Sequence, residues 1–101
     1  MDLEHLIQFL ESQDPGIIVP MGFSNPHSYR VSYKELAFSP VENTSTGEMI
    51  TAAQYALGRT FEGYKGSKYK MDKHTPVHLA EYGDLGEEIG PTLLKYMVGI
   101  Y

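Results

Sequence analysis

The chain has 101 residues, a formal net charge of −5 and no cysteine. This length predicts one domain over residues 1–101, small enough that oligomerisation would add useful buried surface. The acidic balance argues against binding to DNA or RNA duplexes, and the missing cysteines exclude disulfides, thiolate zinc sites and a cysteine nucleophile.

Charge is unevenly distributed along the chain. Residues 59–73 contain five Lys or Arg and two Asp or Glu, a net charge of +3, which leaves −8 for the other residues. A basic patch on an acidic protein suits a small anionic ligand better than a polyanion. The acidic first residues are unlike a signal peptide, and no apolar run approaches the roughly 20 residues of a membrane span. We therefore expect a cytoplasmic protein without a membrane partner.

The first predicted elements are a helix over residues 2–12 and a short strand over residues 17–19. Asp2 is a suitable N-cap for the helix. The apolar residues of this segment recur at helical spacing, at Leu3, Leu6, Ile7 and Leu10. Residues 20–26 contain two prolines and one glycine, which predicts irregular backbone between this strand and the next.

A longer strand is predicted over residues 29–38. Its residues alternate between two faces, with Tyr29, Val31 and Tyr33 on one and Arg30, Ser32 and Lys34 on the other. Leu36 and Phe38 continue the apolar pattern on the second face, which predicts a bend near residues 34–35. Residues 39–44, which include Pro40, are predicted to form a loop.

A central helix and a hairpin are predicted next. Ser45 and Glu48 have the spacing of a capping box, and the helix that they begin is expected to run to Leu57. Residues 60–64 and 69–72 are predicted to be two strands joined by a four-residue turn of lysine, glycine and serine.

The last predicted elements are a strand over residues 77–82, an exposed acidic loop over residues 83–88 and a helix over residues 92–98. Pro91 suits the first position of that helix. The whole order predicts an α+β fold, with an antiparallel β-sheet and N-terminal, central and C-terminal helices packed mainly on one side.

Two histidine motifs offer only weak signals for catalysis or metal binding. His74 and His78 would lie about 13 Å apart on a strand, which is too far to share one ion. His27 and Ser28 are adjacent, so on a strand they point to opposite faces and cannot form a nucleophile–base pair. We expect neither a metal nor another cofactor, and no enzymatic activity from these groups.

The segment 63–70 and Arg30 offer stronger signals, each with an ordinary alternative. The segment combines two glycines, three lysines and two tyrosines, which suit an anion and a stacked base, or simply an exposed hairpin with solubilising lysines. The planar Arg30 guanidinium suits a phosphate or carboxylate ligand. Its alternative role is a structural ion pair with Glu35 or Glu62.

Several stretches resemble one family of small phage and prophage proteins. The family shares a Gly-Phe-Gly-x-Pro-His-Ser-Tyr-Arg-Gly core and a Gly-Tyr-Lys-Gly-Gly turn, and the resemblance extends over nearly the whole chain. The matching stretches here are 22–30, Tyr33, 35–40, 47–49, 60–66 and 79–83. Ser24, Val31 and Ser67 stand where the family has glycine, so backbone geometry beside Arg30 and ligand preference are expected to differ.

The family resembles the type 1 Thoeris anti-defence proteins, which implies a function. Those proteins are sponges that bind cyclic nucleotide immune signals, notably glycocyclic ADP-ribose and in some members cyclic oligonucleotides, without cleaving them. They are homo-oligomers with pockets between subunits, so a dimer or hexamer is expected here. The rival functions are a small phosphodiesterase or nucleotide hydrolase using His27 or His78, and a protein-binding inhibitor of a host defence protein.

The resemblance and the residue chemistry together predict the ligand-binding residues. Arg30, Lys65 and the backbone near Gly66 are expected to bind phosphates, because they offer charged or backbone N–H donors. The residues expected to stack a base are Tyr29, Phe61, Tyr64 and Tyr69. The residues expected to bond ribose are Asn25, His27, Ser28 and Thr75.

Overall fold

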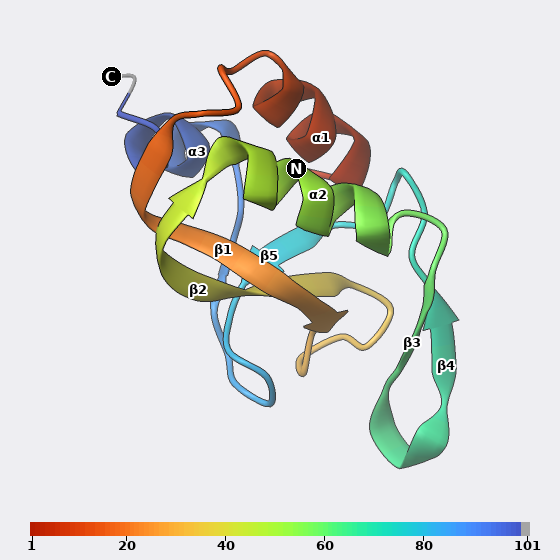
Figure 1. Cartoon of the computed structure of the whole chain (residues 1–101). Coiled ribbons are helices and arrows are strands. Elements are labelled where there is room, and N and C mark those ends of the chain that lie inside the picture. Colours follow the sequence, from red (N-terminus) through yellow and green to blue (C-terminus); the bar gives the residue numbers. More distant parts are fainter. Residues whose placement is uncertain (100–101) are drawn as a thin grey trace.

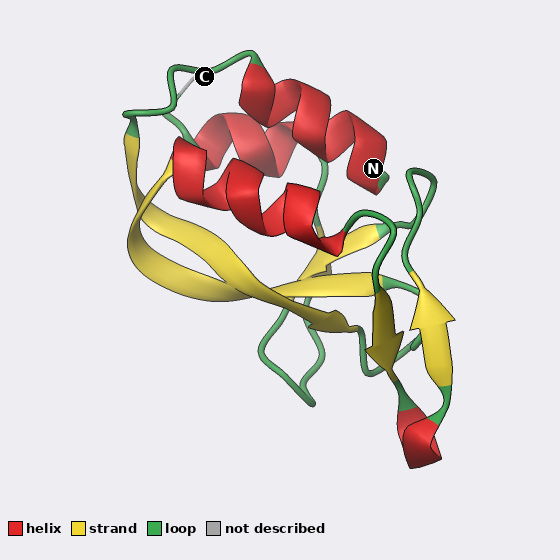
Figure 2. Ribbon diagram, turned by 45° about the vertical axis from the view of Figure 1, so that its right-hand side comes forward, coloured by secondary structure: helices red, strands yellow, loops and turns green. Residues whose placement is uncertain are grey.

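The computed structural model describes residues 1–99 and has three helices on one face of a four-stranded sheet (Figure 2). The helices are α1 (Leu3–Glu11), α2 (Thr46–Ala56) and α3 (Pro91–Met97). This arrangement confirms the predicted α+β class, with the N-terminal, central and C-terminal helices mainly on one side. Among residues 1–99, no helix is long and apolar enough to cross a membrane.

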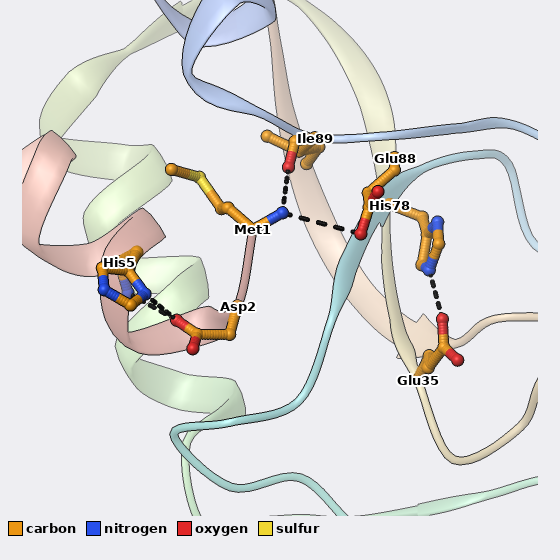
Figure 3. A network of polar contacts seen from close by, with 7 residues as sticks. All are labelled: Met1, Asp2, His5, Glu35, His78, Glu88 and Ile89. Carbon is orange, nitrogen blue, oxygen red and sulfur yellow. Dashed lines mark hydrogen bonds and ion pairs between the residues drawn. The ribbon is translucent and has the colours of Figure 1, made fainter.

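The helices begin where local signals predict. The Asp2 carboxylate accepts a hydrogen bond from the backbone N–H of His5 at 2.9 Å, which caps α1 (Figure 3). At the start of α2, Ser45 Oγ accepts from the Glu48 N–H at 3.0 Å, and the Glu48 carboxylate accepts from the Ser45 N–H at 3.3 Å. These two bonds complete the predicted capping box. Pro91 is the first residue of α3, as expected.

The main sheet has the strand order β1-β2-β5-β6. Its strands are β1 (Ile18–Ser28), β2 (Leu36–Ser45), β5 (Val77–Leu79) and β6 (Glu87–Glu88). β1 and β2 pair antiparallel, β2 and β5 pair parallel, and β5 and β6 pair antiparallel. The sheet is therefore mostly antiparallel, as expected, with one parallel pair at its centre (Figure 1).

The predicted boundaries of β1 and β2 are wrong. β1 runs through residues 20–26, and β2 includes residues 39–44, whereas residues 29–35 form the turn between the strands. The turn is closed by hydrogen bonds from the Tyr29 N–H to the Glu35 carbonyl at 2.9 Å and from the Glu35 N–H to the Ser32 carbonyl at 2.8 Å. The pairing register shifts between Ser24 and Pro26, so the bulge lies in β1 rather than near residue 34.

Pro26 and Pro40 are tolerated in strands because of the sides to which their nitrogens point. The Phe38 carbonyl accepts from the Ala80 N–H, so the backbone groups of Phe38 point away from β1. Backbone groups alternate along a strand, so the Pro40 nitrogen, two residues further on, also points away from β1. β5 pairs with β2 only as far as Phe38, so no neighbouring strand lies opposite that nitrogen. Pro26 lies opposite Phe38, so its nitrogen points to the open edge of β1. Neither proline therefore removes a hydrogen bond between strands.

β3 (Thr60–Glu62) and β4 (Lys68–Lys70) form a separate antiparallel hairpin beyond the end of the main sheet (Figures 1 and 2). This confirms the predicted hairpin, although both strands are shorter than expected. A short 3₁₀ turn, η1 (Tyr64–Gly66), joins the strands, and Lys65 and Gly66 have φ angles of 56° and 76°. Two successive positive φ angles are typical of the type I′ turns that suit the twist of a hairpin.

The second half of the chain departs from prediction at β5 and β6. The strand predicted over residues 77–82 ends at Leu79, and two residues of the predicted acidic loop, Glu87 and Glu88, pair with β5. Gly86 permits this return because an added Cβ atom there would overlap the carbonyl oxygen of Leu79. The tight contact brings the 80–86 loop close to the end of β5.

The core lies between the helices and the sheet, and a smaller cluster lies on the opposite face. Phe23 of β1 and Phe38 of β2 are fully buried in the main core, with ring centroids 4.6 Å apart. Burial of such a side chain contributes about 1.5–3 kcal/mol. Tyr29, Ala37 and Ala80 form the smaller cluster, on the sheet face away from the helices. This cluster anchors the loops that leave β1 and β5.

Candidate ligand cleft

A cleft of about 230 Å³ lies where three loops meet, and we call it the Arg30 cleft. Its walls come from the end of β1 and the β1–β2 turn, the β3–β4 hairpin, and the loop between β5 and β6. The lining residues are Ser28, Arg30, Tyr33, Glu62, Gly63, Tyr64, Lys65, Tyr82 and Gly83. The cleft therefore brings together four of the predicted ligand residues, namely Ser28, Arg30, Tyr64 and Lys65.

Tyr29 holds the chain beside Arg30 in place. Its ring stacks on the His78 ring with centroids 4.0 Å apart and an angle of 13° between the planes. Its hydroxyl donates to the Gly86 carbonyl at 3.1 Å and lies 3.2 Å from the Gly86 N–H, which donates to it. His78 Nε2 in turn lies 2.6 Å from a carboxylate oxygen of Glu35 (Figure 3). Tyr29 is thus buried in a structural network, with one ring face covered by His78.

Arg30 is exposed and holds the β1–β2 turn against the β5–β6 loop. Its Nη1 donates to the Gly83 carbonyl at 3.0 Å. Within residues 1–99 it forms no ion pair, because Glu35 contacts His78 instead and Glu62 lies beyond ion-pair distance. The alternative of a structural ion pair with Glu35 or Glu62 is therefore wrong. A guanidinium without a carboxylate partner can bind an anion.

Ser28 supplies a buried hydroxyl to the cleft. The residue is 5% exposed, and its Oγ has no hydrogen-bond partner among the described residues. Leaving a buried polar group unpaired costs about 1–3 kcal/mol, so the sequence retains an unfavourable group at this position. The oxygen itself has almost no accessible surface, so a ligand reaches it only after a small movement of the cleft wall, and the new bond would then remove the cost.

Tyr33 and Tyr64 lie close together in the cleft, with nearly parallel rings. Their ring centroids are 6.3 Å apart and their planes differ by 18°. Each of these nearly parallel rings offers a face on which a planar group can stack. Gly63 permits the close approach of the hairpin to Tyr33, because a Cβ atom there would lie 2.7 Å from Tyr33 Cβ and 2.7 Å from Tyr69 Cε2.

The charged residues of the cleft have both signs. Arg30 and Lys65 are cationic, and the Lys65 Nζ lies 5.3 Å from the centroid of the Tyr64 ring. Glu62 is the single carboxylate among the lining residues. The cleft can therefore bind an anionic group while also offering one acceptor-only group to a hydrogen-bond donor.

The other predicted ligand residues lie outside this cleft. Asn25 has a φ of 54° in the β1 bulge and lines a separate hollow of about 790 Å³ beside α2. Tyr69 and Thr75 line another hollow of about 500 Å³, where Thr75 Oγ accepts from the Asp72 N–H at 2.9 Å. The half-buried Phe61 packs against the main core. Asn25, Tyr69 and Thr75 are therefore not brought together with Arg30.

Two further predicted residues also fail to line the cleft. His27 is buried, its Nδ1 lies 2.8 Å from the Asn25 carbonyl oxygen, and its Nε2 has no partner among the described residues. Its ring contacts the Tyr82 ring edge-on, with centroids 5.6 Å apart, so it packs against a residue of the cleft wall. Gly66 lies at the tip of the hairpin, and a Cβ atom there would meet no other atom within 4 Å.

The larger hollow beside α2 is a weaker candidate than the Arg30 cleft. Several of its polar side chains already have partners, since Ser45 and Glu48 form the capping box and the Thr44 hydroxyl donates to the Val41 carbonyl at 2.8 Å. Its lining residues also include no lysine or arginine that could bind a phosphate. The Arg30 cleft instead contains an unpaired hydroxyl and a guanidinium without a carboxylate. The chemistry of the Arg30 cleft therefore suits a charged ligand better than the greater volume of this hollow does.

Sequence reasoning missed five lining residues, namely Tyr33, Glu62, Gly63, Tyr82 and Gly83. The sequence pattern predicts a strand face for Tyr33, and it indicates Glu62 only as the alternative ion-pair partner of Arg30. The dipeptides Gly63-Tyr64 and Tyr82-Gly83 were a usable signal, because glycine beside tyrosine places an aromatic ring on a tight turn.

Comparisons of the chain with protein-family models, with curated proteins and with solved structures found no match. The choice of function therefore depends on the geometry of the cleft.

Proposed function

We propose that this protein is a phage anti-defence sponge that binds a cyclic nucleotide immune signal and holds it without cleavage. The ligand is glycocyclic ADP-ribose, or a cyclic oligonucleotide. One observation carries the proposal: a guanidinium without a carboxylate, an unpaired buried hydroxyl and two nearly parallel tyrosine rings line a single cleft.

Each of these groups matches a part of such a ligand. Arg30 and Lys65 offer charge-assisted hydrogen bonds to a phosphate. Ser28 offers a hydroxyl that can bond to a ribose hydroxyl once a small movement of the cleft wall exposes it. Tyr33 and Tyr64 offer ring faces to a base, and stacking on aromatic side chains contributes about 1–3 kcal/mol per base.

The cleft contains no nucleophile–base pair among the described residues. The Ser28 hydroxyl has no hydrogen-bond partner, and His27 and His78 do not line the cleft. A nucleophilic serine needs a base within hydrogen-bond reach, so this geometry favours binding over hydrolysis. Tight retention depends instead on rigid, preorganised contacts.

The volume of the cleft supports a homo-oligomer. Pockets that enclose drug-sized ligands measure about 300–1,000 Å³, whereas this cleft measures about 230 Å³. It suits one base with one phosphate, so a ligand with two phosphates extends beyond it. We propose that a second copy of the chain, in a dimer or hexamer, contacts the remainder.

Calorimetry tests the proposal directly. The purified protein is titrated with cyclic ADP-ribose isomers and with cyclic di- and trinucleotides, and each complex is then heated and its contents separated by chromatography. We expect tight binding of at least one compound and its recovery intact. An altered product would show an enzyme instead, and no binding by any compound would favour the protein-binding inhibitor.

Arg30→Ala locates the site. Loss of a hydrogen bond to a charged group costs about 1.5–3 kcal/mol, so we expect affinity to fall roughly 10- to 150-fold. Arg59→Ala is the matched control, because Arg59 lies over the Tyr55 ring at 4.0 Å, outside the cleft. Equal losses in both variants would indicate a general effect of charge and would contradict a site at Arg30.

A further inference from the structure

Glu62 is an unexpected residue in a cleft for a phosphate-bearing ligand. It is exposed at the end of β3, it lines the cleft, and it forms no ion pair within residues 1–99 although Lys68 lies opposite it in the hairpin. An ionised carboxylate accepts hydrogen bonds and cannot donate them, so it repels phosphate. The part of the ligand beside Glu62 must therefore present hydrogen-bond donors.

The position of Glu62 indicates which part of the ligand that is. Glu62 and Tyr64 flank Gly63, and Gly63 packs directly against Tyr33. The carboxylate thus belongs to the same short section of wall as the tyrosine pair. A base that stacks on Tyr33 or Tyr64 has its polar edge in the same cleft that Glu62 lines.

Accepting the proposed function, we infer that Glu62 selects the base of the ligand and favours adenine or guanine over uracil. Adenine presents an exocyclic amino group to a carboxylate, and guanine presents an amino group with a neighbouring ring N–H, which permits a bidentate contact. Uracil places its one N–H between two carbonyl oxygens, and these repel the carboxylate. Good polar contacts to a base edge discriminate by roughly 10-fold or more.

Three cyclic dinucleotides that share one sugar–phosphate backbone test this inference: cyclic di-GMP, cyclic di-AMP and cyclic di-UMP. Dissociation constants are measured by calorimetry for the wild type, Glu62→Gln and Glu42→Gln. Glu42 is the matched control, because it is an exposed glutamate on β2 that does not line the cleft. Thermal unfolding of each variant verifies that the fold is retained.

We expect the wild type and Glu42→Gln to bind the two purine rings at least 10-fold more tightly than cyclic di-UMP. Glu62→Gln should reduce this ratio to about threefold or less, because an amide offers both a donor and an acceptor and so tolerates uracil. An unchanged ratio in Glu62→Gln, or a wild-type preference for uracil, would overturn the inference.

The two proposals fail separately. Tight binding of all three cyclic dinucleotides without base preference would support the proposed sponge function and overturn the role of Glu62. Absence of binding by all three would also overturn that role, and the sponge would then require binding of glycocyclic ADP-ribose in the same assay.

Discussion

Ser28→Ala should stabilise the free protein and weaken ligand binding. The Ser28 hydroxyl is buried without a partner among residues 1–99, a state that costs about 1–3 kcal/mol. Alanine removes the hydroxyl and leaves a gap of only one atom, so we expect a gain of about 1 kcal/mol in the free energy of unfolding. For a domain of this size, such a gain raises Tm by about 4–8 °C.

The assay is thermal unfolding followed by circular dichroism, with and without the tightest cyclic nucleotide. Thr44→Val is the matched control, because the buried Thr44 hydroxyl donates to the Val41 carbonyl at 2.8 Å. Removing that satisfied hydroxyl should lower the free energy of unfolding by about 1 kcal/mol. The two variants are therefore expected to shift Tm in opposite directions, and only Ser28→Ala should reduce the shift caused by ligand.

A fall in Tm for Ser28→Ala, comparable with that for Thr44→Val, would refute this reasoning. It would mean that the Ser28 hydroxyl already has a partner in solution, and the cleft would lose its main sign of a ligand site.

Three further predictions concern the fold around the cleft and α1. Gly63→Ala should destabilise the protein by about 1–3 kcal/mol and weaken ligand binding, because the new Cβ would lie 2.7 Å from Tyr33 Cβ. Calorimetric unfolding measures this, and a Tm equal to that of the wild type would contradict it. Gly86→Ala should cost about 3 kcal/mol in urea unfolding, since its Cβ would overlap a backbone carbonyl of β5, and a neutral result would disprove the tight return to β6. The pKa of Asp2 is lowered, chiefly by the hydrogen bond from the His5 N–H, so its carboxylate stabilises the fold above pH about 4 and this is lost as pH falls through the lowered pKa. The stability difference between wild type and Asp2→Asn should therefore shrink between pH 7 and pH 3, and a constant difference would argue against the shift.

Helix starts were predictable because their signals are local. Asp2, the Ser45–Glu48 pair and Pro91 each act within one turn of backbone, so sequence spacing alone specifies them. The hairpin was predictable for the same reason, through the glycine and lysine of its turn.

The limits of β1 and β2 were not predictable in this way. Whether Pro26 or Pro40 removes a hydrogen bond depends on which side of the strand has a neighbour, and that is decided by where β5 pairs. The pairing of β2 with β5, about forty positions apart in the chain, therefore decides that these prolines lie within strands, although proline usually indicates a break in a strand. The turn that carries Arg30 was misplaced as a direct result.

The lining of the candidate cleft was predictable by residue type more than by position. Arg30, Lys65 and Tyr64 were identified because charged and aromatic side chains on glycine-rich turns suit a nucleotide. Tyr33 and Glu62 were missed because the cleft forms only when the hairpin folds back against the β1–β2 turn. That approach depends on Gly63, whose missing side chain becomes meaningful only beside Tyr33 and Tyr69.

The bulge in β1 has a consequence for the protein in a crowded cell. β1 is an edge strand, and an open edge of eleven residues invites pairing with strands of other chains. Pro26 points its nitrogen to that edge, where it offers no donor, and Asn25, with a φ of 54°, interrupts the regular row of backbone groups beside it. Asn25 and Pro26, whose residue types are typical of turns, thus protect the open edge of β1 from β-aggregation.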